Sequence, residues 1–110
     1  GIDIQEIVPK MERLSVKFVS DSEKAWMTDN ILESQHVIWG AKEAMYKAWG
    51  KRSIDFKAHL QVHSFDWAKN GVITTSVLEK SHICMHFDVK ALQIDKFMLV
   101  YVKEKFRTIQ

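Results

Sequence analysis

The stretch from Trp39 to Gly50, WGAKEAMYKAWG, decides the fold, because its residues sort onto two faces of one helix. Each residue of an α-helix turns by about 100°, so one face collects His36, Trp39, Gly40, Glu43, Tyr46 and Lys47. The opposite face is apolar and mostly small, with Val37, Ile38, Ala41, Met45 and Ala48. A glycine inside a helix costs roughly 1 kcal/mol against alanine, so we expect Gly40 to let a large group approach. The pattern predicts a long helix that packs with one face and presents polar chemistry on the other.

The polar face has two interpretations. Magnesium takes one or two carboxylates and leaves its other positions to water and phosphate oxygens, while lysine supplies a point charge. Glu43 and Lys47 therefore suit a phosphate ester held through a hard cation. A glutamate followed by a lysine four residues later is also the common stabilising pair on helix surfaces. Spacing alone leaves both interpretations open, and it places Lys42 about 100° from Glu43, on the flank.

Two motifs resemble the signatures of one enzyme family. The positions that match WxxKEAxxKAxG are Trp39, Lys42, Glu43, Ala44, Lys47, Ala48 and Gly50, and Gly1 to Asp3 match GxD at the end of a strand. Both motifs, in this order, resemble those of the 4'-phosphopantetheinyl transferases. The stretch from Gly50 to Val62 is also similar to the segment after the helix in members with two related halves, so the resemblance covers residues 1 to about 65.

The resemblance implies an activity and a site. Members move the phosphopantetheine arm of coenzyme A onto a serine of an acyl or peptidyl carrier protein. In this chain Asp3 and Glu43 would hold Mg²⁺, and Lys47 would neutralise a phosphate oxygen of coenzyme A, with Lys42 as a second candidate. Where two-half members often have a second acid, this chain has Gln5, whose amide can still coordinate but removes one negative charge. The alternative interpretation of Asp3, if the motif is set aside, is a carboxylate at the end of a strand that serves as a turn or cap residue.

A second acid is implicated by the same resemblance. Phe18, Ser20 and Glu23 are similar to the FxSxxE stretch in which two-half members place the presumed general base. Such a base would take the proton from the acceptor serine. The alternative is structural, since acids are favoured at helix N-termini and Ser20 or Asp21 reads as the N-cap of a short helix.

A basic stripe precedes this segment. Pro9 opens a helix on which Lys10, Arg13 and Lys17 recur at spacings of three and four, while Met11, Leu14 and Phe18 line another face. Carrier proteins of fatty-acid and polyketide synthesis are acidic around the modified serine, so the stripe is a candidate docking surface. A merely solvated basic face is the other interpretation.

Composition limits the class of protein. The chain has 110 residues, of which 46% are hydrophobic and 27% charged, and we expect one globular domain over residues 1–110. No apolar run approaches a membrane span, and a net charge of +2 does not indicate nucleic-acid binding. Cys84 is the single cysteine, so no intrachain disulfide can form and a reducing, cytoplasmic setting is expected.

After the helices, the hydrophobic period changes to two. The expected strands are Ile2 to Ile7, Gln61 to Asp66, Val72 to Leu78, Ile83 to Val89 and Phe97 to Val102, with a tight hairpin at Asn70 and Gly71. The last of these strands is apolar on both faces, which predicts a central, covered strand. Helices followed by an antiparallel meander predict an α+β domain with the long helix packed on the sheet.

The chain starts at Gly1, inside the first motif. We therefore expect the C-terminal half of a two-half transferase, or a fragment that lacks a preceding segment. The function implied is magnesium-dependent transfer of phosphopantetheine from coenzyme A. The alternative is a half-domain that binds coenzyme A or a carrier protein without turnover, and a third is an interaction domain whose Glu43–Lys47 pair is only a salt bridge. Self-association could replace a missing half.

Overall fold

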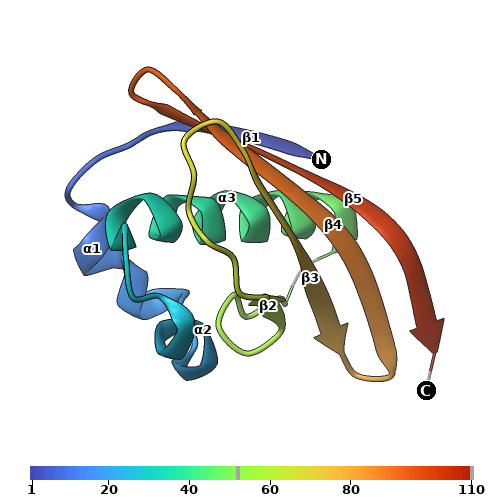
Figure 1. The fold of residues 1–110 in the computed structure, drawn as a ribbon. Helices are drawn as coiled ribbons and strands as arrows, with labels where there is room; N and C mark the ends of the chain where they lie inside the picture. The colour runs from blue at the N-terminus through green and yellow to red at the C-terminus, as the bar shows by residue number, and fades with distance from the viewer. Residues whose placement is uncertain (52, 110) are drawn as a thin grey trace.

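The structure is a computed structural model that describes residues 1–51 and 53–109. Its elements in chain order are β1 (Ile2–Glu6), α1 (Met11–Leu14), the 3₁₀ helix η1 (Ser15–Lys17), α2 (Asp21–Trp26), α3 (Ile31–Trp49), β2 (Leu60–Val62), β3 (Val72–Lys80), β4 (Ile83–Ile94) and β5 (Phe97–Ile109). The strands form one antiparallel sheet in the order β1-β5-β4-β3-β2. The sheet curls across α3, as Figure 1 shows, and this confirms the predicted α+β fold.

The predicted long helix is α3, which has 19 residues. It begins after Asn30, whose backbone is left-handed and whose side chain makes no capping hydrogen bond. It ends at Gly50, where a φ of 68° suits a residue without a Cβ and the N–H donates to the carbonyl of Tyr46. The predicted end of the helix at Gly50 is confirmed.

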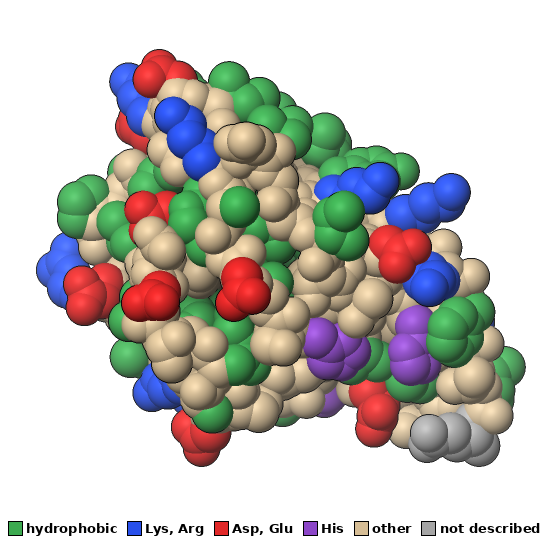
Figure 2. Space-filling view, viewed as in Figure 1, with side chains coloured by type: hydrophobic (Ala, Val, Ile, Leu, Met, Phe, Trp, Pro, Cys, Tyr) green, Lys and Arg blue, Asp and Glu red, His purple; other side chains and the backbone are tan. Residues whose placement is uncertain are grey.

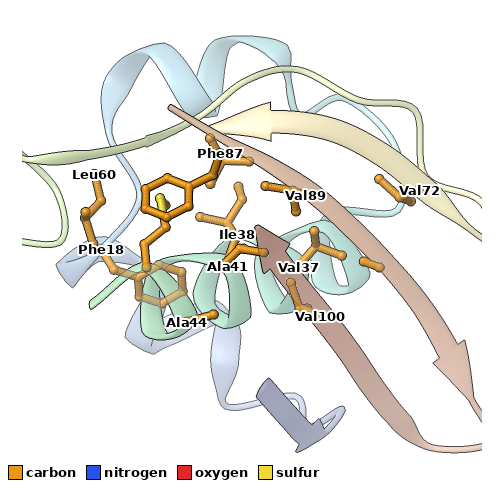
Figure 3. Packing of buried hydrophobic residues seen from close by; sticks show 14 of the residues in the cluster. Phe18, Val37, Ile38, Ala41, Ala44, Leu60, Val72, Phe87, Val89 and Val100 are labelled. Atoms are coloured by element: carbon orange, nitrogen blue, oxygen red, sulfur yellow. The ribbon is translucent and has the colours of Figure 1, made fainter. Parts of the chain in front are cut away.

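The core lies between α3 and one face of the sheet. Val37, Ile38 and Ala41 are fully buried on the helix and point towards Val89 and Val100 of the strands (Figure 3). Tight packing of this kind follows from the small apolar residues that recur along the helix.

Three helix positions differ from the predicted faces. His36 and Gly40 were expected on the polar face but are buried, and Ala48 was expected on the packed face but is exposed. His36 and Gly40 are buried because β1 also lies against α3, so the helix is covered over a wider arc than one stripe.

The connection from β2 to β3 also differs from the prediction. β2 has three residues, and Leu60 pairs with Leu78 while Val62 pairs with Ser76, so residues 63–71 form a loop. The predicted tight hairpin at Asn70 and Gly71 is therefore wrong; these residues lie in a turn within that loop. Tight two-residue turns occur instead between β3 and β4 and between β4 and β5.

β5 lies second from the edge of the sheet, between β1 and β4, and it is not covered on both faces. Met98, Val100 and Val102 point inward and are buried, whereas Phe97 and Tyr101 are 40% and 44% exposed. The prediction of a covered strand is wrong in this respect, because α3 packs on only one face of the sheet.

Candidate active site

The candidate site lies where β1 runs beside α3. Asp3 faces inward from β1, in register with Val100 of β5. A Cβ added at Gly40 would come within 2.6 Å of Val100 Cγ2 and 3.1 Å of Asp3 Oδ2. The large group that Gly40 admits is therefore the chain's own sheet, and the glycine brings Asp3 close to the helix.

The glycine of the first motif has a similar role. A Cβ at Gly1 would lie 3.1 Å from the carbonyl oxygen of Ala44, which is tighter than most Cβ contacts. Gly1 therefore lets β1 lie against the turn of α3 that follows Glu43. The two motifs, distant in sequence, meet because each contributes a glycine at the strand–helix contact.

Two carboxylates and one ammonium lie at the contact between β1 and α3. Asp3 is half-buried, and Lys47 Nζ lies 3.9 Å from its Oδ1. Burial raises the pKa of Asp3, although the ammonium of Lys47 and the amide of Gln5 act to lower it. Burial also raises the pKa of Glu43, the negative charge of Asp3 raises it further, and Lys47 opposes the change. Two carboxylates thus share a partly desolvated region with one lysine.

Gln5 lies next to Asp3. Its Nε2 donates to Asp3 Oδ2 at 2.9 Å and to the backbone carbonyl of His36 at 3.2 Å. The amide therefore steadies the carboxylate of Asp3 as a donor, while its coordination of a metal stays a prediction.

His36 was placed on the polar face by its spacing but has a structural role. It is fully buried, its Nε2 accepts from the N–H of Val8 at 3.0 Å, and its Nδ1 lies 2.7 Å from the carbonyl oxygen of Leu32. Burial lowers the pKa of His36, opposed by the Leu32 carbonyl and the charge of Glu33. The neutral imidazole ties the segment after β1 to α3, and this long-range contact has no signal in the sequence.

The donor set fits a hard divalent cation. Across residues 1–51 and 53–109, no group of three or more His, Cys, Asp or Glu side chains is placed to hold a metal ion. Magnesium needs fewer, because it is commonly bound through one or two carboxylates together with water and phosphate oxygens. Asp3 and Glu43 supply two carboxylates whose mutual repulsion such a cation would relieve.

Glu23 and Lys42 form an ion pair inside the core. Both side chains are fully buried, and Lys42 Nζ donates to Glu23 Oε1 at 2.8 Å. The same ammonium donates to the carbonyls of Phe18 and Phe56 at 2.6 and 2.8 Å. Burial lowers the pKa of Lys42, and the charge of Glu23 opposes this. Lys42 was expected on the flank of the helix as a second candidate for a phosphate ligand, but the segments on either side of α3 enclose it.

Both oxygens of the Glu23 carboxylate accept hydrogen bonds. The carboxylate accepts from the backbone N–H of Ser20 at 2.9 Å and from that of Val62 at 2.7 Å. With the hydroxyl of Ser20 accepting from the N–H of Glu23, this makes a capping box at the start of α2, and the predicted Ser20 cap is confirmed. Because the pair does not face solvent, the predicted roles of Glu23 as base and Lys42 as phosphate ligand require the pair to open.

The basic stripe lies on α1 and η1, and Lys10, Arg13 and Lys17 are all exposed. The predicted helix is divided here into one α-helical turn and one 3₁₀ turn. Beside the stripe is an apolar cavity of about 200 Å³, lined by Met11, Leu14, Lys17, Phe18 and Trp39. Helical periodicity predicted the basic face and the apolar face separately, and the structure places them around one hollow.

The fold is an α+β domain in which the strand–helix contact brings the carboxylates of Asp3 and Glu43 near each other at the edge of the sheet. A family model described as the 4'-phosphopantetheinyl transferase superfamily matches residues 1–102, and the chain belongs to that superfamily. The family is one of transferases that use coenzyme A as donor and a carrier protein as acceptor. The comparisons with curated proteins and with solved structures return no match. Among the described residues, no helix is long and apolar enough to cross a membrane.

Proposed function

We propose that this chain transfers the 4'-phosphopantetheine arm of coenzyme A to a serine of an apo carrier protein in a magnesium-dependent reaction. The observation that carries the proposal is the pairing of Asp3 with Glu43 beside Lys47 at the contact of the two family motifs. In the reaction the serine oxygen forms a bond to the phosphorus next to the pantetheine arm. The pyrophosphate P–O bond breaks and adenosine 3',5'-bisphosphate leaves.

The residues have distinct proposed roles. Asp3 and Glu43 would hold the cation, which would neutralise charge on the pyrophosphate of coenzyme A. Lys47 is 57% exposed and ends near Asp3, so its ammonium can reach a phosphate oxygen. Gln5 would keep the carboxylate of Asp3 in place and could add a neutral ligand. Positioning and charge neutralisation are the main contributions that a protein makes to phosphoryl transfer.

The proton of the serine needs a base. Glu23 remains our proposed base, on condition that its pair with Lys42 opens when substrates bind. The Glu23→Gln variant keeps one acceptor oxygen, so one of the N–H groups of Ser20 and Val62 loses its acceptor, and circular dichroism must show that the variant is folded. A folded Glu23→Gln variant with unchanged kcat would remove Glu23 from this role, and loss of kcat without loss of coenzyme A affinity would support it.

The carrier protein is proposed to dock on α1 and η1. Lys10, Arg13 and Lys17 would attract its acidic surface, and the cavity beside Leu14 and Trp39 would take an apolar side chain. A charge reversal at Arg13 should raise KM for the carrier and leave coenzyme A binding unchanged. Equal KM values for the variant and the unaltered chain would refute this docking site.

The other partners and the setting belong to the same proposal. A second transferase-like half, or a second copy of this chain, would complete the coenzyme pocket. A cytoplasmic setting is supported by Cys84, a free, buried thiol.

Calorimetric titration of coenzyme A, with and without Mg²⁺, tests the central assignment. We expect magnesium-dependent binding that Glu43→Gln weakens by about tenfold or more, because one of two carboxylate ligands is lost. Glu33→Gln is the matched control, since Glu33 is also half-buried on α3. Equal magnesium dependence in Glu43→Gln and the unaltered chain would overturn the metal assignment.

One observation favours a second candidate, a domain that binds coenzyme A or a carrier protein without turnover. Gln5 is neutral and donates to Asp3, so the site has less negative charge than three acids would give. Tight binding of coenzyme A with no transfer to any carrier protein would select this alternative.

A further inference from the structure

The cavity beside the basic stripe has an apolar wall and an exposed mouth. Its volume is about 200 Å³, and the residues that line it are Met11, Leu14, Lys17, Phe18 and Trp39. Met11 and Phe18 are buried, whereas Leu14 is 41% exposed. The buried side chains therefore form the inner wall, and Leu14 lies at the mouth.

The mouth of the cavity is positively charged. Lys17 lines the cavity and is exposed, and Lys10 and Arg13 are exposed on the same segment. Among the described residues, none of these three cations takes part in an ion pair. Lys57 adds a fourth ammonium, because its Nζ donates to the carbonyl of Val16 on η1 at 3.2 Å.

The acid of α1, Glu12, does not cancel this charge. It follows Lys10 by two positions, or about 200° around a helix, so it lies on the other side of the segment. Figure 2 shows basic and hydrophobic side chains adjoining at the left of the view, where α1 lies in Figure 1. A hollow apolar wall with unpaired cations at its mouth is complementary to a molecule that has an apolar chain and a negatively charged end.

We propose that this cavity binds a medium-chain aliphatic carboxylate, with its alkyl chain inside and its carboxylate at Lys17. An apolar cavity of about 150 Å³ stays dry and binds benzene, which has about six carbons. In the same proportion, a cavity of about 200 Å³ holds about eight carbons. The ammonium of Lys17 favours a carboxylate at the end of the chain over an alcohol or an amine.

The same cavity and cations form the proposed docking site of the carrier protein. An aliphatic carboxylate combines the apolar group and the negative charge that this site would take from the carrier. Its binding should therefore raise the apparent KM for the carrier and leave coenzyme A binding unchanged. Only this competition rests on the proposed function; the binding of the carboxylate does not.

Calorimetric titration of sodium octanoate into the full chain tests the binding without any activity measurement. Butanoate, hexanoate and octanoate should bind progressively more tightly, by about fourfold in Kd for each methylene that enters the cavity. Decanoate should gain little over octanoate, because the cavity is then full. Octylammonium should bind more weakly than octanoate, and Lys17→Gln should raise the Kd for octanoate about two- to fivefold, the range of an exposed ion pair.

Leu14→Asp identifies the place of binding, because it puts a carboxylate at the mouth of the cavity. Val16→Asp is the matched control: Val16 is 57% exposed on η1 and lies outside the cavity lining, so it brings the same charge without blocking the mouth. We expect Leu14→Asp to raise the Kd for octanoate about tenfold more than Val16→Asp does. Circular dichroism checks that each variant is folded, and Leu14→Gln repeats the test if Leu14→Asp is not.

Three results would overturn the proposal. One is a folded chain that does not bind octanoate at millimolar concentrations. Another is an affinity that does not rise from butanoate to octanoate. The third is an equal Kd in Leu14→Asp and Val16→Asp, which would place the ligand elsewhere. Octanoate binding that leaves the KM for the carrier unchanged would count only against the proposed docking site.

Discussion

Replacing Gly40 by alanine reverses the usual effect of that substitution in a helix. Gly→Ala normally stabilises a helix interior by about 1 kcal/mol. Here the new Cβ would lie 2.6 Å from Val100 Cγ2 and 3.0 Å from Val100 Cβ. Val100 is fully buried on β5, between β1 and β4. Overpacking of this kind costs about 1–3 kcal/mol, so after the helix gain of about 1 kcal/mol we expect a net loss of up to about 2 kcal/mol.

Urea unfolding followed by circular dichroism measures this change, and two further variants identify its cause. Gly40→Ala/Val100→Ala should be at least as stable as Val100→Ala alone, because the added methyl fills space that the valine leaves. Gly71→Ala is the matched control: its Cβ would meet nothing within 4 Å, so its stability should be unchanged or rise by up to about 1 kcal/mol. A Gly40→Ala variant stabilised by about 1 kcal/mol would refute the packing argument.

Three other predictions concern buried charges. Lys42→Met leaves the Glu23 carboxylate unpaired in the core and should cost about 3–5 kcal/mol in urea unfolding; a loss below about 1 kcal/mol would contradict this. Glu23→Gln/Lys42→Met removes the unpaired charge and should recover part of the loss, because one of the N–H groups of Ser20 and Val62 then lacks its acceptor. The folded-state pKa of His36 is below 6.5, so the unfolded chain binds a proton first and stability should fall as pH drops through about 6.5; His36→Gln should remove that part of the pH dependence. The pKa of Asp3 is raised on folding, so its ionised form opposes folding above the unfolded value of 3.8. Thermal melts of Asp3→Asn at pH 7 should therefore show no loss of stability when Mg²⁺ is absent. They should also show no stabilisation when Mg²⁺ is added.

The sequence was informative where the signal is local. The presence of the long helix α3, its end at Gly50 and the Ser20 cap depend on residues within a few positions of one another, and all three are confirmed. The family resemblance is confirmed over a longer range than its motifs covered, since the match reaches residue 102.

The features that the sequence did not predict depend on contacts between distant segments. Glu23 and Lys42 are separated by 19 positions, and each alone resembles a surface charge in its helical pattern. The closeness of Val100 to Gly40 depends on how β5 enters the sheet, which helical periodicity cannot reveal. The predicted strand from Gln61 to Asp66 is wrong beyond Val62: residues 63–66 alternate like a strand but lie in the loop, where Phe65 packs on the core from outside the sheet.

The adjacent residues Lys42 and Glu43 divide structure and chemistry between them. Lys42 is held by three acceptors from α2, the segment before it and the segment after α3. An ammonium held at three points limits rotation of the helix about its own axis. Glu43 follows by about 100°, so the same contacts orient its carboxylate towards the charge of Asp3. Lys42 can therefore support the site without touching a phosphate, because the buried lysine sets the direction in which Glu43 points.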